Sequence, residues 1–336
     1  MANNRFKVLY VDTPTGWDAS IETEELAKVG AELVFASVKA EDAVIAAGRE
    51  AEADGFLVRS AKITRRVMES LPNLKVVGRT GIGVDAVDVD AATELGVAVC
   101  NTPGFCAAEV ADHTMLFVLA LAKQLQAHTN MIRSGGWSQI RAKQMPAVYS
   151  LTLGLVAFGE IAREVAKRAR PFGLRLLAYD PYVDQATAEP FGVSMVPLDT
   201  LLAESDFVSV HAPLGKHTRH LIGGREIALM KPTAYLLNTA RGPVVDEQAL
   251  IAALKEGRIG GAGLDVFEQE PVDPQNPLLN MENVIVTPHM AGSSLQAATE
   301  GRRRIATAVA TVLAGGWPGR DLYNPQVKET YRQRRP

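Results

Sequence analysis

Short apolar segments recur along the 336-residue chain, separated by longer stretches whose apolar positions have helical spacing. Most of these segments are continuous hydrophobic runs rather than alternations of apolar and polar residues. Continuous runs are typical of parallel strands that are buried on both faces of a sheet. A first group of five predicted strands covers residues 8–12, 32–37, 55–60, 74–80 and 97–101.

A second group of predicted strands follows after a gap. It covers residues 151–159, 174–180, 207–213, 234–240, 261–267 and 284–289. Helical patterns such as 161–170 and 247–256 lie between these strands, which is the order of βαβ units. The pattern therefore predicts an α/β protein with two doubly wound parallel sheets.

Two long helical patterns lie outside these βαβ units. Residues 109–132 separate the two groups of strands, and we interpret them as a helix that connects two domains. Residues 294–314 follow the last strand, so we expect this helix to return to the first domain. The predicted domains are then a discontinuous one, 1–103 with 292–336, and a continuous one, 104–291.

Composition excludes several classes of protein. Hydrophobic residues make up 47% and charged residues 22%, which is typical of globular domains and unlike disordered or fibrous chains. The 35 basic and 38 acidic residues leave a net charge of -3, so we do not expect nucleic acid as a partner. The longest clearly apolar run, 115–122, is far shorter than the ~20 residues that span a bilayer, so we do not expect a membrane either. Cys100 and Cys106 are too few for a disulfide framework, and no C-x-x-C metal motif occurs. We therefore expect no metal. No signal peptide is visible, so we expect a cytoplasmic protein.

A modified nucleotide-binding motif opens the second group of strands. The three positions of a Rossmann G-x-G-x-x-G/A loop are occupied by Ala157, Gly159 and Ala162. Eighteen residues later the next strand ends at Asp180, where a carboxylate binds ribose hydroxyls and repels a 2′-phosphate. These features favour NAD over NADP. The alternatives are an ordinary strand-to-helix turn and a capping role for Asp180 before Pro181.

Three polar side chains follow predicted strands of this second sheet: Arg241, Glu270 and His289. Open parallel sheets bind ligands at the carboxyl ends of their strands. A histidine accepts a hydroxyl proton near neutral pH, a carboxylate fixes its tautomer, and an arginine holds a substrate carboxylate. Together they fit oxidation of a secondary alcohol with nicotinamide as the hydride acceptor. Taken one at a time, each has an alternative without a catalytic role. Arg241 could be a surface cation, Glu270 a carboxylate at the rim of the sheet, and His289 a hydrogen-bonded histidine of the core.

At these residues the sequence resembles the D-isomer-specific 2-hydroxyacid dehydrogenase family. The motifs that carry the resemblance are VVGRTGIGVD at 76–85, CNTP at 100–103, NTARGPVVD at 238–246, GLDVF at 263–267 and TPH at 287–289. Within the family, LGVAVCN at 95–101 and AALKEGRI at 252–259 are similar to the phosphoglycerate dehydrogenase and C-terminal binding protein branches. The resemblance implies a flavodoxin-like substrate domain and a Rossmann NAD-binding domain, with the substrate between them.

The resemblance also implies roles for individual residues. His289 would be the acid/base, Glu270 its partner and Arg241 the substrate-orienting cation. The cofactor-binding set would be Gly159, Glu160, Ile161, Asp180, His211, Pro213, Thr239, Ala240, Arg241, Asp265, His289 and Gly292, with Asp265 on the nicotinamide carboxamide. The substrate-binding set would be Arg59, Arg79, Gly81, Ile82 and Arg241. The helix from Glu109 and the arm through Trp137 resemble the family's dimer interface, which implies a homodimer.

The function predicted from these observations is an NAD-dependent D-2-hydroxyacid dehydrogenase. It would transfer a hydride reversibly between NAD(H) and a small 2-hydroxy or 2-keto acid, with 3-phosphoglycerate, hydroxypyruvate and glyoxylate as candidate substrates. One alternative is an NAD(H)-binding, corepressor-like protein that acts through protein contacts. Another is a pseudoenzyme with weakened NAD binding, because Ala157 and Glu160 depart from the usual glycine and basic residue. The phosphoglycerate branch often carries a further C-terminal regulatory domain, which we do not expect here.

Overall fold

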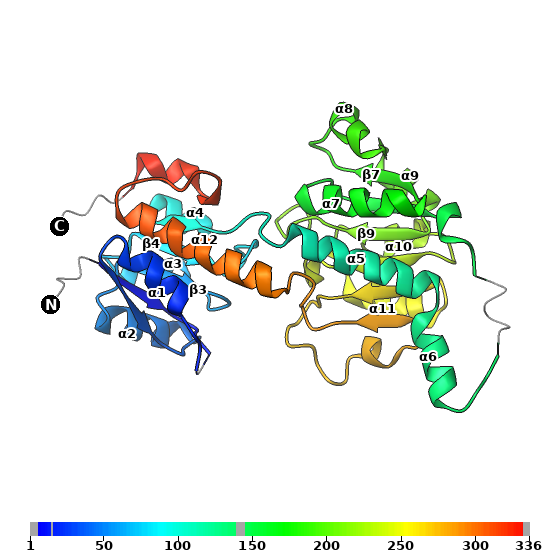
Figure 1. Cartoon of the computed structure of the whole chain (residues 1–336), viewed down its shortest axis with the longest axis horizontal. Helices are drawn as coiled ribbons and strands as arrows, with labels where there is room; N and C mark the ends of the chain where they lie inside the picture. Colours follow the sequence, from blue (N-terminus) through cyan, green and yellow to red (C-terminus); the bar gives the residue numbers. More distant parts are fainter. Residues whose placement is uncertain (1–5, 15, 139–144, 332–336) are drawn as a thin grey trace. The chain divides into compact units, whose positions relative to one another are not determined.

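The computed structural model describes residues 6–14, 16–138 and 145–331. The chain divides into two compact units (Figure 1). Unit 1 consists of Met1–Phe105 together with Ser294–Pro336, and unit 2 of Cys106–Ser293. The domain limits expected from the sequence, 103/104 and 291/292, lie close to these divisions.

Unit 1 contains a five-stranded parallel sheet. Its strands are β1 (Phe6–Tyr10), β2 (Ala31–Phe35), β3 (Gly55–Val58), β4 (Val76–Arg79) and β5 (Ala98–Cys100), in the spatial order β2-β1-β3-β4-β5. This order is that of flavodoxin-like sheets.

Side-chain alternation along β1 builds a hydrophobic core on each face of this sheet. Val8 and Tyr10 pack with residues of α1 (Ser20–Ala27) and α12 (Leu295–Leu313). Leu9 and Val11 pack on the other face, with α2 (Glu41–Glu50), α3 (Arg65–Ser70) and α4 (Val89–Glu94). Both faces are covered, which is why the strands contain continuous hydrophobic runs.

Helix α12 follows all of unit 2 in sequence but packs in unit 1, against α1, β3, β4 and β5. A buried ion pair joins it to α1: the Arg302 guanidinium donates to Glu22 over 2.8 Å (Nε to Oε1) and 2.6 Å (Nη2 to Oε2). Only 1% of the Glu22 side chain is exposed, against 15% for Arg302. Arg302 also lies over the ring of Trp17, 4.7 Å from the ring centroid. The ion pair therefore fixes the returning helix to the first helix of the chain.

Unit 2 contains a seven-stranded parallel sheet in the order β12-β11-β10-β9-β6-β7-β8. The strands are β6 (Thr152–Val156), β7 (Arg175–Tyr179), β8 (Val193–Met195), β9 (Phe207–Val210), β10 (Tyr235–Asn238), β11 (Gly261–Leu264) and β12 (Val284–Val286). The strand order reverses between β6 and β9, as in a doubly wound Rossmann sheet. The two-domain parallel α/β architecture expected from the sequence is confirmed.

Helices cover both faces of the unit 2 sheet. One face carries α5 (Ala107–Ala122) and α7 (Glu160–Ala169). The other carries α9 (Leu198–Glu204), α10 (Gly224–Leu229) and α11 (Glu247–Lys255). The remaining helices are α6 (Leu125–Arg133) and the short α8 (Gln185–Ala188).

Three expectations about these elements were wrong. Strand β8 was missed, because three residues are too few to show a hydrophobic pattern. The single helix expected over 109–132 is two helices, because Gln124 adopts the left-handed conformation with φ of 48°. The first of them does not serve as a connector: α5 packs within unit 2 on α7, β10 and β11. No described helix is both long enough and apolar enough to cross a membrane.

The Arg302–Glu22 pair gives a direct test of how α12 is held. We expect Arg302→Ala to lower the free energy of unfolding by about 3–5 kcal/mol, because it leaves the Glu22 carboxylate buried without its partner. Urea unfolding followed by tryptophan fluorescence measures this change. Arg66→Ala is the control, since Arg66 is 59% exposed and its ion pairs should contribute less than about 1 kcal/mol. Equal losses in the two variants would contradict the assignment.

Candidate active site

Three neighbouring strands of unit 2 present the three candidate catalytic side chains. Arg241 follows β10, Glu270 follows β11 and His289 follows β12, and these strands are adjacent in the sheet. Because all three strands are parallel, their carboxyl ends meet at one edge. The sheet therefore brings together residues that are far apart in sequence; Arg241 and His289 are separated by 48 positions.

His289 and Glu270 form a hydrogen-bonded pair. The distance from His289 Nδ1 to Glu270 Oε2 is 2.6 Å, and 46% of the His289 side chain is exposed. Since an ionised carboxylate only accepts hydrogen bonds, Nδ1 carries the proton in this pair. In the neutral imidazole, the lone pair is then on Nε2, where it can accept a proton from a ligand.

Glu270 is held in its ionised form. Burial raises the pKa of its carboxyl group, but the hydrogen bond from His289, the charges of His289 and Arg241 and the Phe267 N–H together lower it below the usual value. The Phe267 N–H donates to Oε1 over 3.1 Å. The carboxylate is consequently fixed from both of its oxygens.

Arg241 lies on a loop that is held by its neighbours. Its carbonyl accepts a hydrogen bond from the Asn238 side chain at 2.9 Å, and its Nη1 donates to the Ala240 carbonyl at 2.7 Å. The next residue must be glycine, because a Cβ at Gly242 would lie 1.9 Å from the Phe267 carbonyl carbon. This close approach keeps the Arg241 loop beside the segment that carries Glu270.

The turn that carries His289 is strained and is held by one buried carboxylate. His289 has a positive φ of 53°, which is uncommon for a residue with a Cβ. Its N–H donates to the Asp265 carbonyl at 2.7 Å, while the Met290 and Ala291 N–H groups donate to the Asp265 carboxylate at 2.8 Å each. Asp265 is 1% exposed. These bonds offset the cost of the left-handed residue.

The candidate phosphate-binding loop lies between β6 and α7. Ala157 has a positive φ of 70°, so the alanine adopts the conformation for which this motif normally uses glycine. Asp180 Oδ2 accepts the Phe158 N–H at 2.9 Å, and Oδ1 accepts the Tyr182 N–H at 2.9 Å. Asp180 therefore holds this loop from the end of the neighbouring strand β7.

The same loop leaves open space beside the backbone of Gly159. Apart from its chain neighbours Phe158 and Glu160, no described residue has a heavy atom within 4 Å of a Cβ built on Gly159, and α7 begins directly afterwards at Glu160 and Ile161. The backbone N–H groups and the dipole at a helix N-terminus favour the binding of phosphate groups. Ala162 is fully buried, as the third position of the motif requires. The residues of this loop thus fit a dinucleotide.

Four other expected cofactor residues lie after β9 and β10. His211 is hydrogen-bonded to Ser209 at 2.9 Å, and burial lowers the pKa of His211 to about 4, so its imidazole is neutral at pH 7. The Pro213 carbonyl accepts a hydrogen bond from Thr218 at 2.5 Å. Thr239 is buried, and the Ala240 N–H donates to the Asn238 side chain at 3.0 Å. The last expected residue, Gly292, lies against the buried thiol of Cys106.

The four expected substrate-binding residues of unit 1 follow β3 and β4. Asp12 accepts the N–H groups of Arg59, Ser60 and Ala61 at 2.6–2.8 Å and thereby shapes the loop after β3. Burial raises the pKa of Asp12, but these hydrogen bonds outweigh that effect, so the pKa lies below its usual value. After β4, the Arg79 guanidinium lies over Gly81, where a Cβ would be 1.7 Å from its Nη1. The carbonyl of Ile82 accepts a hydrogen bond from Asn101 at 2.6 Å.

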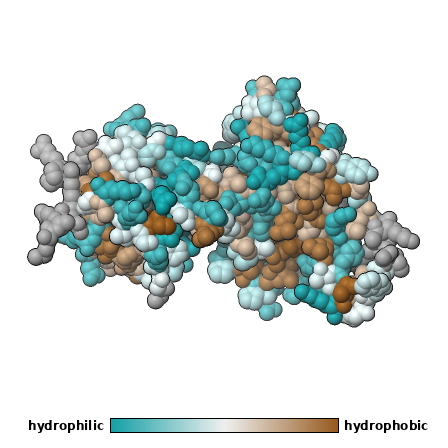
Figure 2. All heavy atoms as spheres, in the orientation of Figure 1, coloured by the Kyte–Doolittle hydropathy of each residue, from teal (hydrophilic) through white to brown (hydrophobic). Residues whose placement is uncertain are grey.

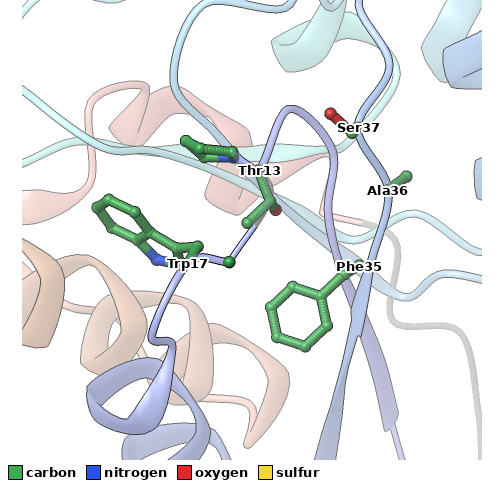
Figure 3. A pocket seen from close by; sticks show the side chains of 7 residues that line it. Thr13, Trp17, Phe35, Ala36 and Ser37 are labelled. Atoms are coloured by element: carbon green, nitrogen blue, oxygen red, sulfur yellow. The ribbon is translucent and has the colours of Figure 1, made fainter.

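Sequence reasoning missed the surroundings of Arg59. Asp12 was included in a predicted strand, and its position at a strand end was the signal for a role. Trp17 packs under Arg59, with the guanidinium carbon 5.1 Å from the ring centroid. Figure 3 shows the rings of Trp17 and Phe35 on either side of Thr13, where they line a pocket of about 320 Å³. Among the described residues, no group of three or more histidine, cysteine, aspartate or glutamate side chains is placed to hold a metal ion.

Comparison with known proteins identifies the family. Residues 115–291 match the model of the D-isomer specific 2-hydroxyacid dehydrogenase, NAD binding domain. This chain belongs to the D-isomer-specific 2-hydroxyacid dehydrogenase family. The resemblance inferred from the motifs is thereby confirmed, and the cofactor of this domain is NAD.

Relatives in this dehydrogenase family differ in substrate. The chain is 44% identical over 266 residues to the D-3-phosphoglycerate dehydrogenase of Methanocaldococcus jannaschii, a match that covers 79% of this chain and 50% of that relative. The chain thus spans about half the length of the phosphoglycerate dehydrogenases that it matches. It is 45% identical over 251 residues to the glyoxylate reductase of Korarchaeum cryptofilum, covering 74% of each chain.

A solved structure of the family contains a bound cofactor and a hydroxy acid. The D-lactate dehydrogenase of Aquifex aeolicus, complexed with NAD and lactic acid, is 30% identical to this chain with a TM-score of 0.81. The similarity covers 92% of this chain and 96% of that one.

Ala157 offers a test of the strained loop. We expect Ala157→Gly to raise the free energy of unfolding by up to about 1 kcal/mol, because glycine relieves the left-handed strain. The matched control is Ala252→Gly in α11, an exposed helical position where glycine should cost about 1 kcal/mol. Urea unfolding measures both changes. A loss at position 157 equal to that at position 252 would contradict the strain.

The Glu270–His289 pair predicts a pH dependence of stability. The pKa of Glu270 is lower in the folded protein than the value of about 4.3 expected in the unfolded chain, so ionised Glu270 favours folding above that pH. This contribution is lost as the pH falls through the lowered pKa. We expect the difference in unfolding free energy between wild type and Glu270→Gln to be present at pH 7 and to shrink below about pH 4. A difference that grows on acidification would contradict the pairing.

Proposed function

We propose that this protein is an NAD-dependent dehydrogenase of a small D-2-hydroxy acid and a reductase of the matching 2-keto acid. The observation that carries the proposal is the His289–Glu270 hydrogen bond beside Arg241, at the ends of three adjacent strands of the NAD-binding unit. A base, its orienting carboxylate and a cation are what hydride removal from a hydroxy acid requires.

The residues of this chain handle the proton and the substrate. When bound, NAD supplies the hydride acceptor in oxidation and the hydride donor in reduction. In oxidation, His289 Nε2 takes the hydroxyl proton while the hydride leaves carbon; in reduction, the protonated His289 returns the proton to the carbonyl oxygen. Glu270 stabilises the imidazolium and holds the ring in place. Arg241 binds the substrate carboxylate and orients the reacting carbon.

The cofactor-binding residues are proposed on their positions. Gly159, Glu160 and Ile161 would present backbone to the pyrophosphate, and Asp180 would accept hydrogen bonds from the ribose. Asp265 still has acceptor capacity for the carboxamide, since its two oxygens together have about four lone-pair sites. His211, Pro213, Thr239, Ala240 and Gly292 complete the proposed set.

Substrate selection is assigned to unit 1. Arg59, Arg79 and the backbone of Gly81 and Ile82 would bind anionic groups, and the proposed substrates are 3-phosphoglycerate, hydroxypyruvate and glyoxylate. All three agree with the names of relatives: a phosphoglycerate dehydrogenase, a glyoxylate reductase and a hydroxypyruvate reductase. Asp12 holds the backbone at Arg59, and the ring of Trp17 packs against the Arg59 guanidinium, which supports Arg59 as an oriented cation.

We also propose a cytoplasmic homodimer. Leu116, Leu125 and Ile132 of α5 and α6 are each more than half exposed, and Trp137 is 85% exposed. Figure 2 shows apolar residues gathered on this part of unit 2. An apolar face of this kind is typical of a subunit interface, and sedimentation velocity would measure the assembly state.

The deciding experiment measures NADH consumption with a panel of 2-keto acids and compares wild type with His289→Ala. We expect the variant to lose about 10²–10⁴-fold in kcat, the usual contribution of a general acid. NADH binding, measured by fluorescence, should be retained. Arg66→Ala in α3 is the control, because Arg66 is exposed and lies outside both the proposed site and the proposed dimer interface, so kcat should be unchanged.

The outcomes separate the candidate functions. Full turnover by His289→Ala on the preferred substrate would overturn the proposed chemistry. NADH binding by the wild type without turnover of any 2-keto acid would instead support a binding protein. Failure to bind NADH would support a pseudoenzyme.

A further inference from the structure

Helix α5 reaches the candidate site through two consecutive residues. The distance from His113 Nε2 to Thr287 Oγ1 is 3.0 Å, and that from Thr114 Oγ1 to Thr239 Oγ1 is 3.2 Å. Thr287 follows β12 and Thr239 follows β10. One helix therefore contacts the loops on both sides of β11, which carries Asp265 at its end.

The hydrogen bonds of His113 form a chain with a defined direction. Thr287 Oγ1 has a single proton and donates it to Asp265 Oδ1 over 2.5 Å. Its oxygen can therefore only accept from His113, so His113 Nε2 must carry a proton. The direction of donation is His113 to Thr287 to Asp265, and it ends on a carboxylate that is 1% exposed.

Asp265 links this chain of hydrogen bonds to the turn that carries His289. Its carboxylate accepts the N–H groups of Met290 and Ala291, and its carbonyl accepts that of His289. All three successive N–H groups of the strained turn thus end on one residue. A rotation of the Asp265 side chain would release two of them and free the left-handed His289.

The surroundings of His113 hold its ring in one orientation. The His113 side chain is 11% exposed, and its ring packs edge-on against Phe117 with the centroids 4.7 Å apart. Burial lowers the pKa of His113, and the charge of Asp265, with Oδ1 4.0 Å from His113 Nε2, opposes this only in part. His113 is consequently a neutral donor at pH 7.

We propose that His113 is a positioning residue, which acts through Thr287 and Asp265 to hold the turn that presents His289. The inference rests on the proposed function, since it assigns His113 to the same proton-transfer step. His113 does not touch the reacting atoms. Its effect should appear in kcat, because the turn decides where His289 Nε2 lies, while the substrate carboxylate is bound elsewhere.

The test compares His113→Gln with His113→Leu. Glutamine can place an amide N–H near the position of the imidazole Nε2–H, whereas leucine fills similar space without a donor. We expect His113→Leu to lower kcat at least about 10-fold with the KM for the keto acid changed less than about 2-fold, and His113→Gln to retain kcat within about 3-fold. Thermal unfolding of both variants monitors their stability.

A second variant tests the chain itself. Thr287→Val removes the hydroxyl that links His113 to Asp265 and should lower kcat as much as His113→Leu does. The double variant should then lose little more than either single variant, because residues that act through one chain of contacts are not additive. Multiplicative losses in the double variant, or equal losses in the Gln and Leu variants, would overturn the proposal.

A spectroscopic measurement keeps the inference separate from the proposed function. Long-range ¹H–¹⁵N spectra of the six histidines report the tautomer and surroundings of each ring without turnover. We expect the His289 signals to shift in His113→Leu and Thr287→Val but to stay in place in His113→Gln. If the wild type reduces no 2-keto acid, the proposed function fails, and these spectra still decide the positioning role: unchanged His289 signals in His113→Leu would overturn it.

Discussion

Within each unit, carboxylates at strand ends accept backbone N–H groups from the loop after the neighbouring strand. They hold these loops in place at the edge of the sheet where the candidate site residues lie. Asp12 after β1 accepts three N–H groups from the loop after β3, and Asp180 after β7 accepts one from the loop after β6. Asp265 after β11 accepts two from the turn after β12. In each case the two strands pair directly in the sheet. Asp12 and Asp265 are buried, so their carboxylates need such donors to offset the cost of desolvation, and this makes the conformation of their loops specific.

These hydrogen bonds between carboxylates and loop backbones explain where the candidate site residues lie. The loop held by Asp12 carries Arg59, the loop held by Asp180 carries Gly159, and the turn held by Asp265 carries His289. Parallel strands leave their carboxyl-end loops without a hairpin to shape them, and an acidic side chain one strand away supplies the missing constraint. The proposed chemistry therefore depends on three carboxylates that shape loops. The sequence predicted a role for two of them, Asp180 and Asp265, but as cofactor-binding residues, and it predicted no role for Asp12.

Sequence patterns predicted the strands and the residues at their ends because both depend on local composition. Eleven of the twelve described strands appear as hydrophobic runs, and Arg241, Glu270 and His289 follow three of them. The break between α5 and α6 had no such signal, since residues 109–132 contain neither glycine nor proline. The break lies where the chain stops packing against the core of unit 2: α5 has ten buried residues and α6 has none. Likewise, the clamp by Asp12 depends on the pairing of β1 with β3, which no local pattern reveals.

The departures from the Rossmann motif look different once the loop is seen in three dimensions. Ala157 departs from the usual glycine of the motif, yet it adopts the left-handed conformation that the motif needs. The strain of order 1 kcal/mol is offset by the Asp180 hydrogen bond to the next residue, Phe158, whose ring is fully buried. Glu160 is exposed at the start of α7. Because the backbone conformation of the loop is retained, the alanine at position 157 alters the cost of forming the loop rather than the backbone geometry offered to a pyrophosphate.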